Sequence, residues 1–484
     1  MKEKLQEYNN ILFKKQYNIN LLHWELMLEA PSSVTDYLIS LINELEIELF
    51  KLGTSNEYKE LLISYLNDPT SDKDSDFYRV TKKNYDTLIK SESLPEEFLR
   101  EYNEVCSKSN KVWEEAKTNN NYELYKPYLK KVIELTKEYY SYYDPDKKLY
   151  DAMLDRYESG MTQNVLDVLF DELKKELIPL IQQVKKDTPS KKNYLKEYTR
   201  DDLMKCAKVL LNYIGFDMNR ATLGIYPHGF MEKMTSEDVR IAFAHTNDPI
   251  SFVSTIIHEG GHGIFEQNVD KEICNENIDL YALHESQSRF YENVLGRNIN
   301  FWYPIYDKVK EILKLDMDIN EFVSELNYVI PSKIRTEADE LTYCLHIIIR
   351  YEIEKDIFNG TLSVDDIPNA WNKKMKEYLG VDIVRDDEGL MQDMHWSDGS
   401  FGYFPSYLVG NIYDGMYIGA IEEKLGSIDN ILKEGRIKEI TKFLNENIHS
   451  HGSAYDGVDI IKNITGKDIT VEPIINYFKK KYIK

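Results

Sequence analysis

"STIIHEGGHGIFEQ", from Ser254 to Gln267, places two histidines, two glutamates and three glycines in a segment with helical spacing. Apolar residues recur every three or four positions, from Phe252 through Ile256 to Ile264, and predict a buried stripe on a helix. Each glycine costs a helix interior about 1 kcal/mol relative to alanine. We therefore expect tertiary packing and a bound metal to stabilise this helix.

Residues His258 to His262 form the pattern HExxH. Positions four apart lie on one helix face, so both histidines can direct imidazole nitrogens at one ion. Glu259 is rotated by about 100° from His258, so it flanks the ion and can take a proton from a bound water. The alternative is a polar helix face whose two histidines have ordinary partners.

The glycines have separate interpretations. Gly260 lies on the buried stripe, where a missing side chain lets a neighbouring helix approach, and Gly261 lies at its border. Gly263 is one turn beyond Glu259, so we expect it to leave space for the base, its water or a peptide.

A catalytic zinc site needs a third protein ligand and an open position for water. Glu266 lies on the same stripe as both histidines, and three ligands along one line cannot surround an ion. The third ligand should therefore come from another helix. Spacing alone leaves five downstream acids open: Glu272, Glu276, Asp279, Glu285 and Glu292.

The segment "LHESQSRFYENVLG", from Leu283 to Gly296, predicts a helix with Glu285 on its polar side. Glu285 precedes Arg289 by one turn, and a solvated ion pair between them is the plain interpretation. The alternative is that this polar side lines a cleft and that Glu285 binds the metal.

Composition limits the class of protein. The chain has 484 residues, of which 42% are hydrophobic and 30% charged, with a net charge of -23. Such a negative charge makes nucleic acid an unexpected partner. Four cysteines without CxxC spacing indicate neither a disulfide framework nor a cysteine zinc site. No apolar run approaches the length of a membrane span, and no signal peptide is evident, so we expect a cytoplasmic protein without membrane association.

Most of the chain has the pattern of amphipathic helices, and no segment is long enough to indicate a linker between domains. We therefore expect residues 1–484 to form a single, mostly α-helical domain. "ATLGIYPHGF" (residues 221–230) and "DVRIAFAHT" (residues 238–246) break this pattern. They predict a small antiparallel sheet beside the metal helix, whose backbone could bind an extended peptide.

Four motifs occur in order along the chain: "HEGGH" at 258–262, "HESQ" at 284–287, "IRTEAD" at 334–339 and "GLMQDMHW" at 389–396. This series resembles the carboxypeptidase Taq family of metallocarboxypeptidases. The resemblance implies that Glu285 is the third ligand. It also implies a saddle-like helical fold with a deep groove, a homodimer, and removal of C-terminal residues from peptides.

Two family motifs are imperfect here. The family pattern HPF is His228-Gly229-Phe230, and DxRxT is Asp238-Val239-Arg240-Ile241-Ala242. The side chains His228 and Arg240 are retained, and we expect them to contact substrate. The proline and the threonine hydroxyl are absent, so the resemblance implies the reaction type more firmly than it implies substrate preference or rate.

The predicted reaction uses Glu259 as general base toward a metal-activated water and then as proton donor to the leaving amine. His395, Tyr403 and Tyr407 are candidate donors to the oxyanion. Core packing is the alternative for the tyrosines.

An exopeptidase must recognise a free carboxylate, which suits the bidentate fork of arginine. Arg335 opens the predicted helix "IRTEADELTYCLHIIIRYEIE", and the resemblance favours it as the anchor. Its plain interpretation is a helical pair with Asp339, and Arg350 is the second candidate. His245 is a possible substrate contact, and His284 a possible orienting partner of a ligand.

We therefore predict a zinc-dependent carboxypeptidase, with cobalt or manganese possible in the same site. The first alternative is a related helical HExxH oligopeptidase or dipeptidase. The second is a metal-stabilised binding protein without catalysis, against which the intact Glu259 argues.

Overall fold

The computed structural model describes residues 1–187, 194–274 and 280–483. Helices make up most of this part of the chain, and three strands form one small sheet. The predicted mostly helical fold class is confirmed. No helix among the described residues is long and apolar enough to cross a membrane.

The chain divides into two compact units, each built from three segments. The first contains residues 1–88, 191–326 and 417–466, and the second contains residues 89–190, 327–416 and 467–484. The predicted single domain and its deep groove stay predictions.

The first unit holds the sheet and the HExxH helix. Its elements are α1 (Lys2–Leu28), α2 (Thr35–Gly53), α3 (Asn56–Leu66), α9 (Arg200–Ile214), β1 (Ala221–Ile225), β2 (Phe230–Thr235), β3 (Asp238–Phe243), α10 (Pro249–Asn268), α11 (Tyr281–Arg289), a π-helical turn (Phe290–Gly296), α12 (Ile299–Trp302), α13 (Tyr306–Leu313), α14 (Ile319–Leu326), α18 (Ile428–Lys433), α19 (Ile437–Asn447) and α20 (Gly457–Thr465). Two further helices, α4 (Asp76–Glu92) and α17 (Phe404–Leu425), have residues in both units.

The sheet has the order β1-β3-β2. β2 and β3 are antiparallel and joined by a tight turn at Ser236 and Glu237, whereas β1 runs parallel to β3. The predicted antiparallel pairing is therefore right for β2 and β3 and wrong for β1. The first predicted strand, residues 221–230, spans a turn between Ile225 and Phe230, so the sequence pattern merged β1 with the start of β2.

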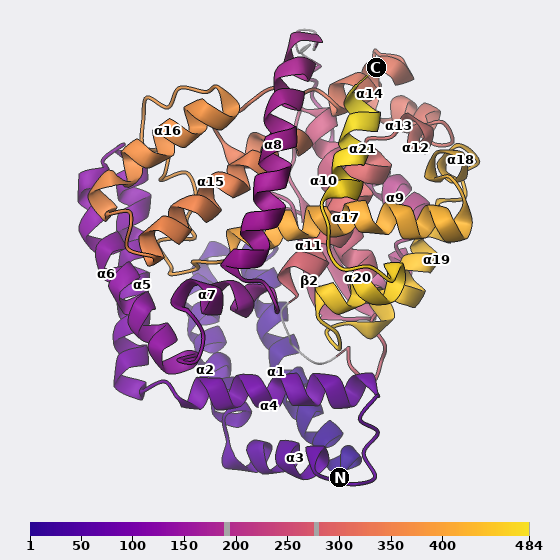
Figure 1. The fold of residues 1–484 in the computed structure, drawn as a ribbon. Coiled ribbons are helices and arrows are strands. Elements are labelled where there is room, and N and C mark those ends of the chain that lie inside the picture. The colour runs from indigo at the N-terminus through magenta and orange to yellow at the C-terminus, as the bar shows by residue number, and fades with distance from the viewer. Residues whose placement is uncertain (188–193, 275–279, 484) are drawn as a thin grey trace. The chain divides into compact units, whose positions relative to one another are not determined.

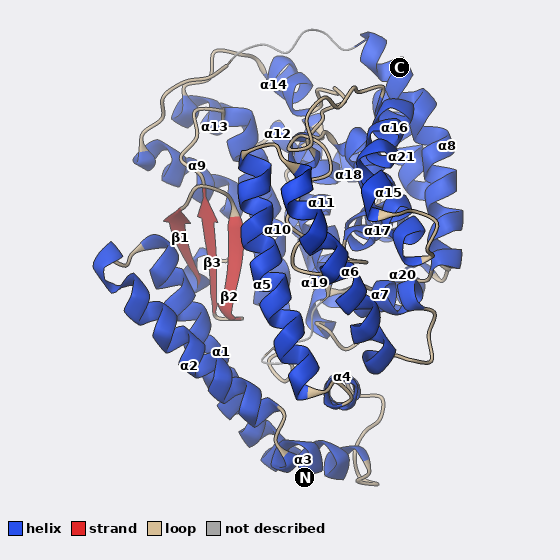
Figure 2. Ribbon diagram, turned by 90° about the vertical axis from the view of Figure 1, so that its left-hand side faces the viewer, coloured by secondary structure: helices blue, strands red, loops and turns tan. Residues whose placement is uncertain are grey.

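Helices pack on both faces of the sheet. On one face, Trp24 of α1 joins Met234 and Ala242 in a buried apolar cluster. On the other face, Phe243 meets Phe252 of α10 with ring centroids 5.5 Å apart. Alternation along β3 produces this division, since neighbouring strand residues face opposite sides. Figure 2 shows the three strands beside α10.

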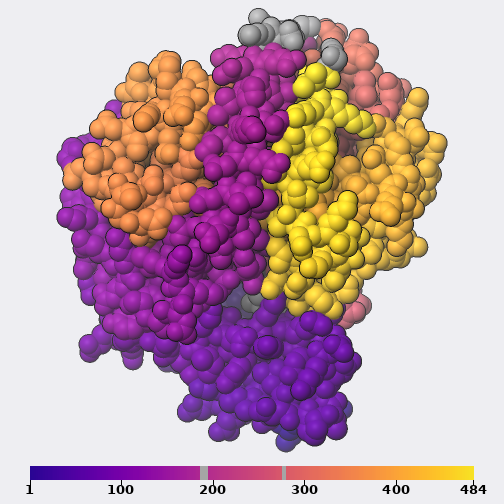
Figure 3. Space-filling view, viewed as in Figure 1, coloured from indigo at the N-terminus to yellow at the C-terminus, as the bar shows by residue number. Residues whose placement is uncertain are grey.

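The second unit contains helices and loops and no strand among its described residues. The helices of this unit are α5 (Glu96–Thr118), α6 (Tyr122–Tyr143), α7 (Leu149–Tyr157), α8 (Gln163–Asp187), α15 (Glu340–Phe358), α16 (Ile367–Leu379) and α21 (Glu472–Tyr482). The helices α5 and α6 pack side by side, and α8 contacts α15, α16 and α21 (Figure 1). On the face seen in Figure 3, α8 lies between α16 and α21.

The helix α15 begins later than the sequence predicted. Asp339 caps it by accepting hydrogen bonds from the backbone N–H groups of Leu341 and Thr342. Arg335 lies before this cap in a short 3-10 turn, so the predicted helical pair between Arg335 and Asp339 is wrong. An aspartate is a much better N-cap than an arginine, and it sets the helix start here.

Candidate metal centre

The helix α10 presents His258 and His262 on one face. Asp248 caps its first turn by accepting from the N–H groups of Ile250 and Ser251, and Pro249 opens the helix. The two imidazole rings lie 5.0 Å apart between centroids, as the four-residue spacing predicts.

Two glycines let other helices approach α10. A Cβ at Gly260 would lie 2.6 Å from an Ile214 side-chain carbon, so this position packs against α9 as expected. A Cβ at Gly261 would lie 2.8 Å from both the Gln287 carbonyl oxygen and the Ser288 Cα. Only glycine permits this approach of the α11 backbone, which brings Glu285 toward the histidines.

Glu285 completes a cluster of three potential ligands. Its Oε2 lies 3.5 Å from His262 Nε2 and 4.0 Å from His258 Nε2. The three ligand atoms all lie within 4.8 Å of one another. Two imidazoles and one carboxylate at such separations fit a divalent ion with one position left for water.

The other acids considered as the third ligand lie outside this cluster or outside the described residues. Glu266 pairs with Lys233 at 2.8 Å, Glu272 pairs with Lys2, and Glu292 faces the opposite nitrogen of His258. Glu276 and Asp279 lie outside the described residues.

Glu285 also forms the ion pair that was its plain interpretation. Its Oε1 accepts a hydrogen bond from Arg289 at 2.8 Å, while its Oε2 faces the histidines. Burial opposes the charge of this carboxyl, but Arg289 and the two histidines together hold its pKa well below the ordinary value. Both interpretations of Glu285 therefore hold at once, one for each oxygen.

Glu292 is a member of the site that sequence reasoning considered only as a ligand. Its Oε2 lies 3.0 Å from His258 Nδ1, and its Oε1 accepts from Arg297 at 2.9 Å. A ligating histidine almost always donates its second ring N–H to such a partner, which fixes its tautomer and orientation. Glu292 follows Glu285 by seven residues, a spacing that places both side chains on the same face of a regular helix. This spacing was the sign in the sequence that Glu292 belongs to the site.

Glu259 is 8% exposed. Burial raises its pKa to about 7, with His258 opposing the shift and Glu285 adding to it. Carboxyl groups in such surroundings exchange protons near neutral pH, as a general base must.

The glycine that borders Glu259 is Gly229 rather than Gly263. A Cβ at Gly263 would lie 2.5 Å from the Phe216 ring, so this glycine serves packing and its expected role in access is wrong. A Cβ at Gly229 would lie 2.4 Å from Thr255 Cγ2 and 3.1 Å from Glu259 Oε1.

The three residues considered as substrate contacts near the sheet lie in different surroundings. His228 is exposed, with its Nδ1 3.1 Å from the Gly229 carbonyl oxygen. Arg240 is paired with Asp238 at 2.9 Å, and its guanidinium lies 5.6 Å from the Trp24 ring. His245 lies 2.8 Å from the Tyr198 carbonyl oxygen.

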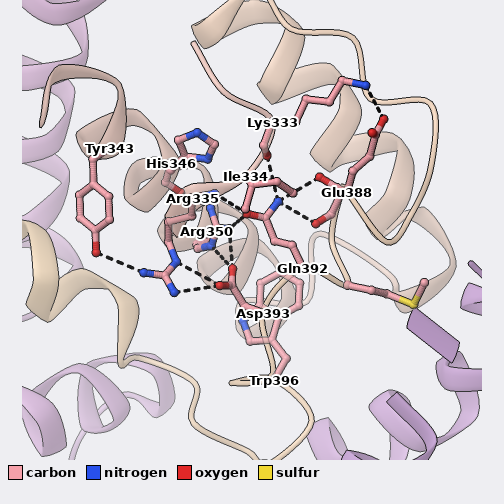
Figure 4. A network of polar contacts seen from close by, with 12 residues as sticks. Lys333, Ile334, Arg335, Tyr343, His346, Arg350, Glu388, Gln392, Asp393 and Trp396 are labelled. Atoms are coloured by element: carbon pink, nitrogen blue, oxygen red, sulfur yellow. Dashed lines mark hydrogen bonds and ion pairs between the residues drawn. The ribbon is translucent and has the colours of Figure 1, made fainter. Parts of the chain in front are cut away.

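The second unit brings Arg335 and Arg350 together on one carboxylate (Figure 4). Asp393 accepts from Arg335 at 2.9 Å through Oδ1 and from Arg350 at 2.8 Å through Oδ2. Burial works against the charge of Asp393, but the two guanidinium groups lower its pKa well below the ordinary value. The Arg350 side chain is 0% exposed and the Arg335 side chain 10%, so Arg335 is the more accessible of the two.

His395 and the two tyrosines lie in the same unit as Arg335. The His395 ring is 5.2 Å from the Tyr403 ring, which is 5.2 Å from the Tyr407 ring. Tyr407 in turn lies 5.3 Å from the Arg335 guanidinium. Burial lowers the pKa of His395 to about 4, so its ring is neutral at pH 7. Four predicted site residues thus form one cluster.

Comparison with known proteins decides the family. A model of the carboxypeptidase Taq (M32) metallopeptidases matches residues 1–482. The chain belongs to the carboxypeptidase Taq family. It is 38% identical over 477 residues to carboxypeptidase 1 of Bacillus subtilis, covering 96% of this chain and 94% of that protein.

Other carboxypeptidase Taq proteins are also similar. Thermostable carboxypeptidase 1 of Thermus thermophilus is 33% identical over 411 residues, covering 81% of this chain and 80% of that protein. The crystal structure of an M32 carboxypeptidase from Deinococcus radiodurans has a TM-score of 0.93 at 26% identity, covering 99% and 98% of the two chains. The protein is therefore a metallocarboxypeptidase.

Proposed function

We propose that this metallocarboxypeptidase hydrolyses the C-terminal bond of peptides at a zinc centre held by His258, His262 and Glu285. The convergence of these three ligand atoms within 4.8 Å carries the proposal. All three side chains are at least partly buried, which suits a site that holds its ion tightly.

A divalent ion bound there would polarise the scissile carbonyl and lower the pKa of water. Glu259 accepts the proton of the attacking water and then delivers it to the leaving amine. The Glu292 carboxylate holds the Nδ1–H of His258, so that Nε2 keeps its lone pair for the ion. Two histidines and a carboxylate suit zinc, and cobalt or manganese could take the same ligands.

Arg335 binds the free carboxylate of the peptide in this proposal. The Asp393 carboxylate accepts hydrogen bonds from Nε and one terminal nitrogen of Arg335, and the Tyr343 hydroxyl accepts one from the other terminal nitrogen at 3.3 Å. Each terminal nitrogen keeps a second N–H for the carboxylate of a peptide. Arg350 also donates to Gln392 and to the His346 carbonyl oxygen, so it serves as a support. His395, Tyr403 and Tyr407 are proposed donors to the oxyanion.

Several finer properties belong to the same proposal. We propose substrate contacts by His228 and Arg240, a homodimer, a cytoplasmic location and one functional domain over residues 1–484. The family resemblance supports the dimer, and the retained side chains support the two contacts.

The proposal is tested with one peptide and its C-terminally amidated form. We expect the zinc-loaded protein to release C-terminal residues from the free peptide and to leave the amide intact. The Glu259→Gln variant should keep its zinc and lose turnover. Equal cleavage of both peptides would instead indicate an oligopeptidase and remove the role of Arg335. Zinc binding without hydrolysis of any peptide would indicate a binding protein.

A further inference from the structure

The two histidines of the proposed metal centre are held in different ways. His258 has the carboxylate of Glu292 at its Nδ1, 3.0 Å away. The Nδ1 of His262 is buried and has no hydrogen-bond partner among the described residues. Before an ion binds, an imidazole whose second nitrogen has no partner can rotate about its Cβ–Cγ bond, so another contact must orient the His262 ring.

His284 supplies such a contact. Its ring lies over the His262 ring at a centroid distance of 4.4 Å and an interplanar angle of 16°, so the two rings stack. Phe265 meets the His284 ring edge-on, at 5.2 Å and 83°. Stacking restricts rotation of both rings, because turning either one would drive its edge into its neighbour.

His284 itself contacts a charged group on another element. Its Nε2 lies 3.2 Å from Glu266 Oε1 on α10, an ion-pair contact without hydrogen-bond geometry. Glu266 Oε2 lies 2.8 Å from Lys233 Nζ on β2, which is likewise an ion pair without hydrogen-bond geometry. The side chains of Glu266 and Lys233 are only 14% and 20% exposed, which limits their movement. The sheet is therefore connected through Glu266 to the ring that covers His262.

We propose that His284 is a positioning residue that fixes the ring of His262 by stacking, and that Glu266 and Lys233 hold His284 in place. This inference rests on the proposed ligand role of His262. It assigns a function to Glu266, which lies on the ligand stripe of α10 but outside the ligand cluster.

The test compares two apolar replacements, His284→Leu and His284→Phe. Both lose the contact with Glu266 and fill the space, and only phenylalanine keeps a flat ring. Zinc affinity is measured by competition with a chromophoric chelator, and ligand geometry by the visible spectrum of the cobalt form. We expect His284→Leu to weaken zinc binding by about tenfold or more and to change the cobalt spectrum. His284→Phe should stay within about threefold of the wild type.

Two controls make the result specific. His245→Ala removes a histidine of the same unit that has no contact with the cluster, and it should leave zinc affinity unchanged. Melting temperatures of the metal-free variants show whether His284→Leu folds as His284→Phe does. Wild-type zinc affinity in both His284 variants, or equal weakening in both, would overturn the inference. His262→Ala separates the two proposals: retained zinc affinity there refutes the ligand role, and the inference with it.

Discussion

Gly229 lies directly before β2 and contacts Thr255 beside the carboxyl group of Glu259. The contact is close enough that a single added methyl group at position 229 would overlap Thr255 Cγ2. The sequence departs from its family pattern at this glycine, and the structure places the departure against the proposed base. Small displacements of a catalytic group reduce turnover steeply, since reacting atoms must lie within a narrow range of distances.

We predict that Gly229→Ala lowers kcat on the order of tenfold, with zinc content unchanged. The added Cβ pushes on Thr255 and Glu259 together. Thr255→Ser removes the overlapping Cγ2, so the double variant should recover most of the lost activity. Steady-state kinetics on all four forms measures the coupling. A wild-type kcat in Gly229→Ala, or no recovery in the double variant, would contradict this account.

At the scale of elements, the approach of α11 to α10 builds the metal centre. The HExxH spacing fixes two ligand positions within one helix, and it was readable because helical periodicity is local. The position of Glu285 depends on backbone contact at Gly261 between two helices. Spacing could not choose Glu285 among five acids, and only the family resemblance did so. The parallel placement of β1 escaped prediction for the same reason, since it depends on a long-range pairing.

We predict opposite effects for two helical Gly→Ala substitutions. Gly261→Ala should destabilise the protein by about 2 kcal/mol and weaken zinc binding, because the backbone of α11 has no room for a methyl group. The matched control is Gly419→Ala on α17, where a Cβ meets nothing within 4 Å. It should stabilise by about 0.5–1 kcal/mol through helix propensity alone. Urea unfolding of both variants measures the contrast, and a stabilising Gly261→Ala would refute the role of that contact.

At the scale of the whole molecule, each unit buries ionisable side chains whose polar partners lie in the same unit. The second unit buries Glu354, which accepts hydrogen bonds from Trp396 at 2.7 Å, the Gly402 N–H at 2.8 Å and Tyr150 at 2.9 Å. Burial raises the pKa of Glu354 to about 7 although these donors oppose the shift. The sequence predicted a helix over the segment that contains Glu354, but it could not show the polar partners, because they come from distant segments.

Glu354 makes stability depend on pH in a defined direction. Its pKa is higher in the folded protein than the ordinary value of 4.5, so folding takes up a proton between these values. The stabilisation that the folded protein gains by holding this proton on Glu354 is complete below pH 4.5, and it is lost as the pH rises to about 7. We predict that the stability of the wild type relative to Glu354→Gln falls by about 3 kcal/mol over this range. Denaturant titrations at pH 5 and pH 7.5 measure this; an unchanged or rising difference would contradict it.

The most direct test of the metal centre is a crystal structure with anomalous diffraction at the zinc edge. The account predicts one strong peak at about 2.0–2.2 Å from His258 Nε2, His262 Nε2 and a Glu285 oxygen. Glu259 should lie beside the ion without binding it, and Glu292 should keep its contact with His258 Nδ1. A peak that lacks Glu285 among its ligands, or a zinc ion held by another group of residues, would contradict the central claim.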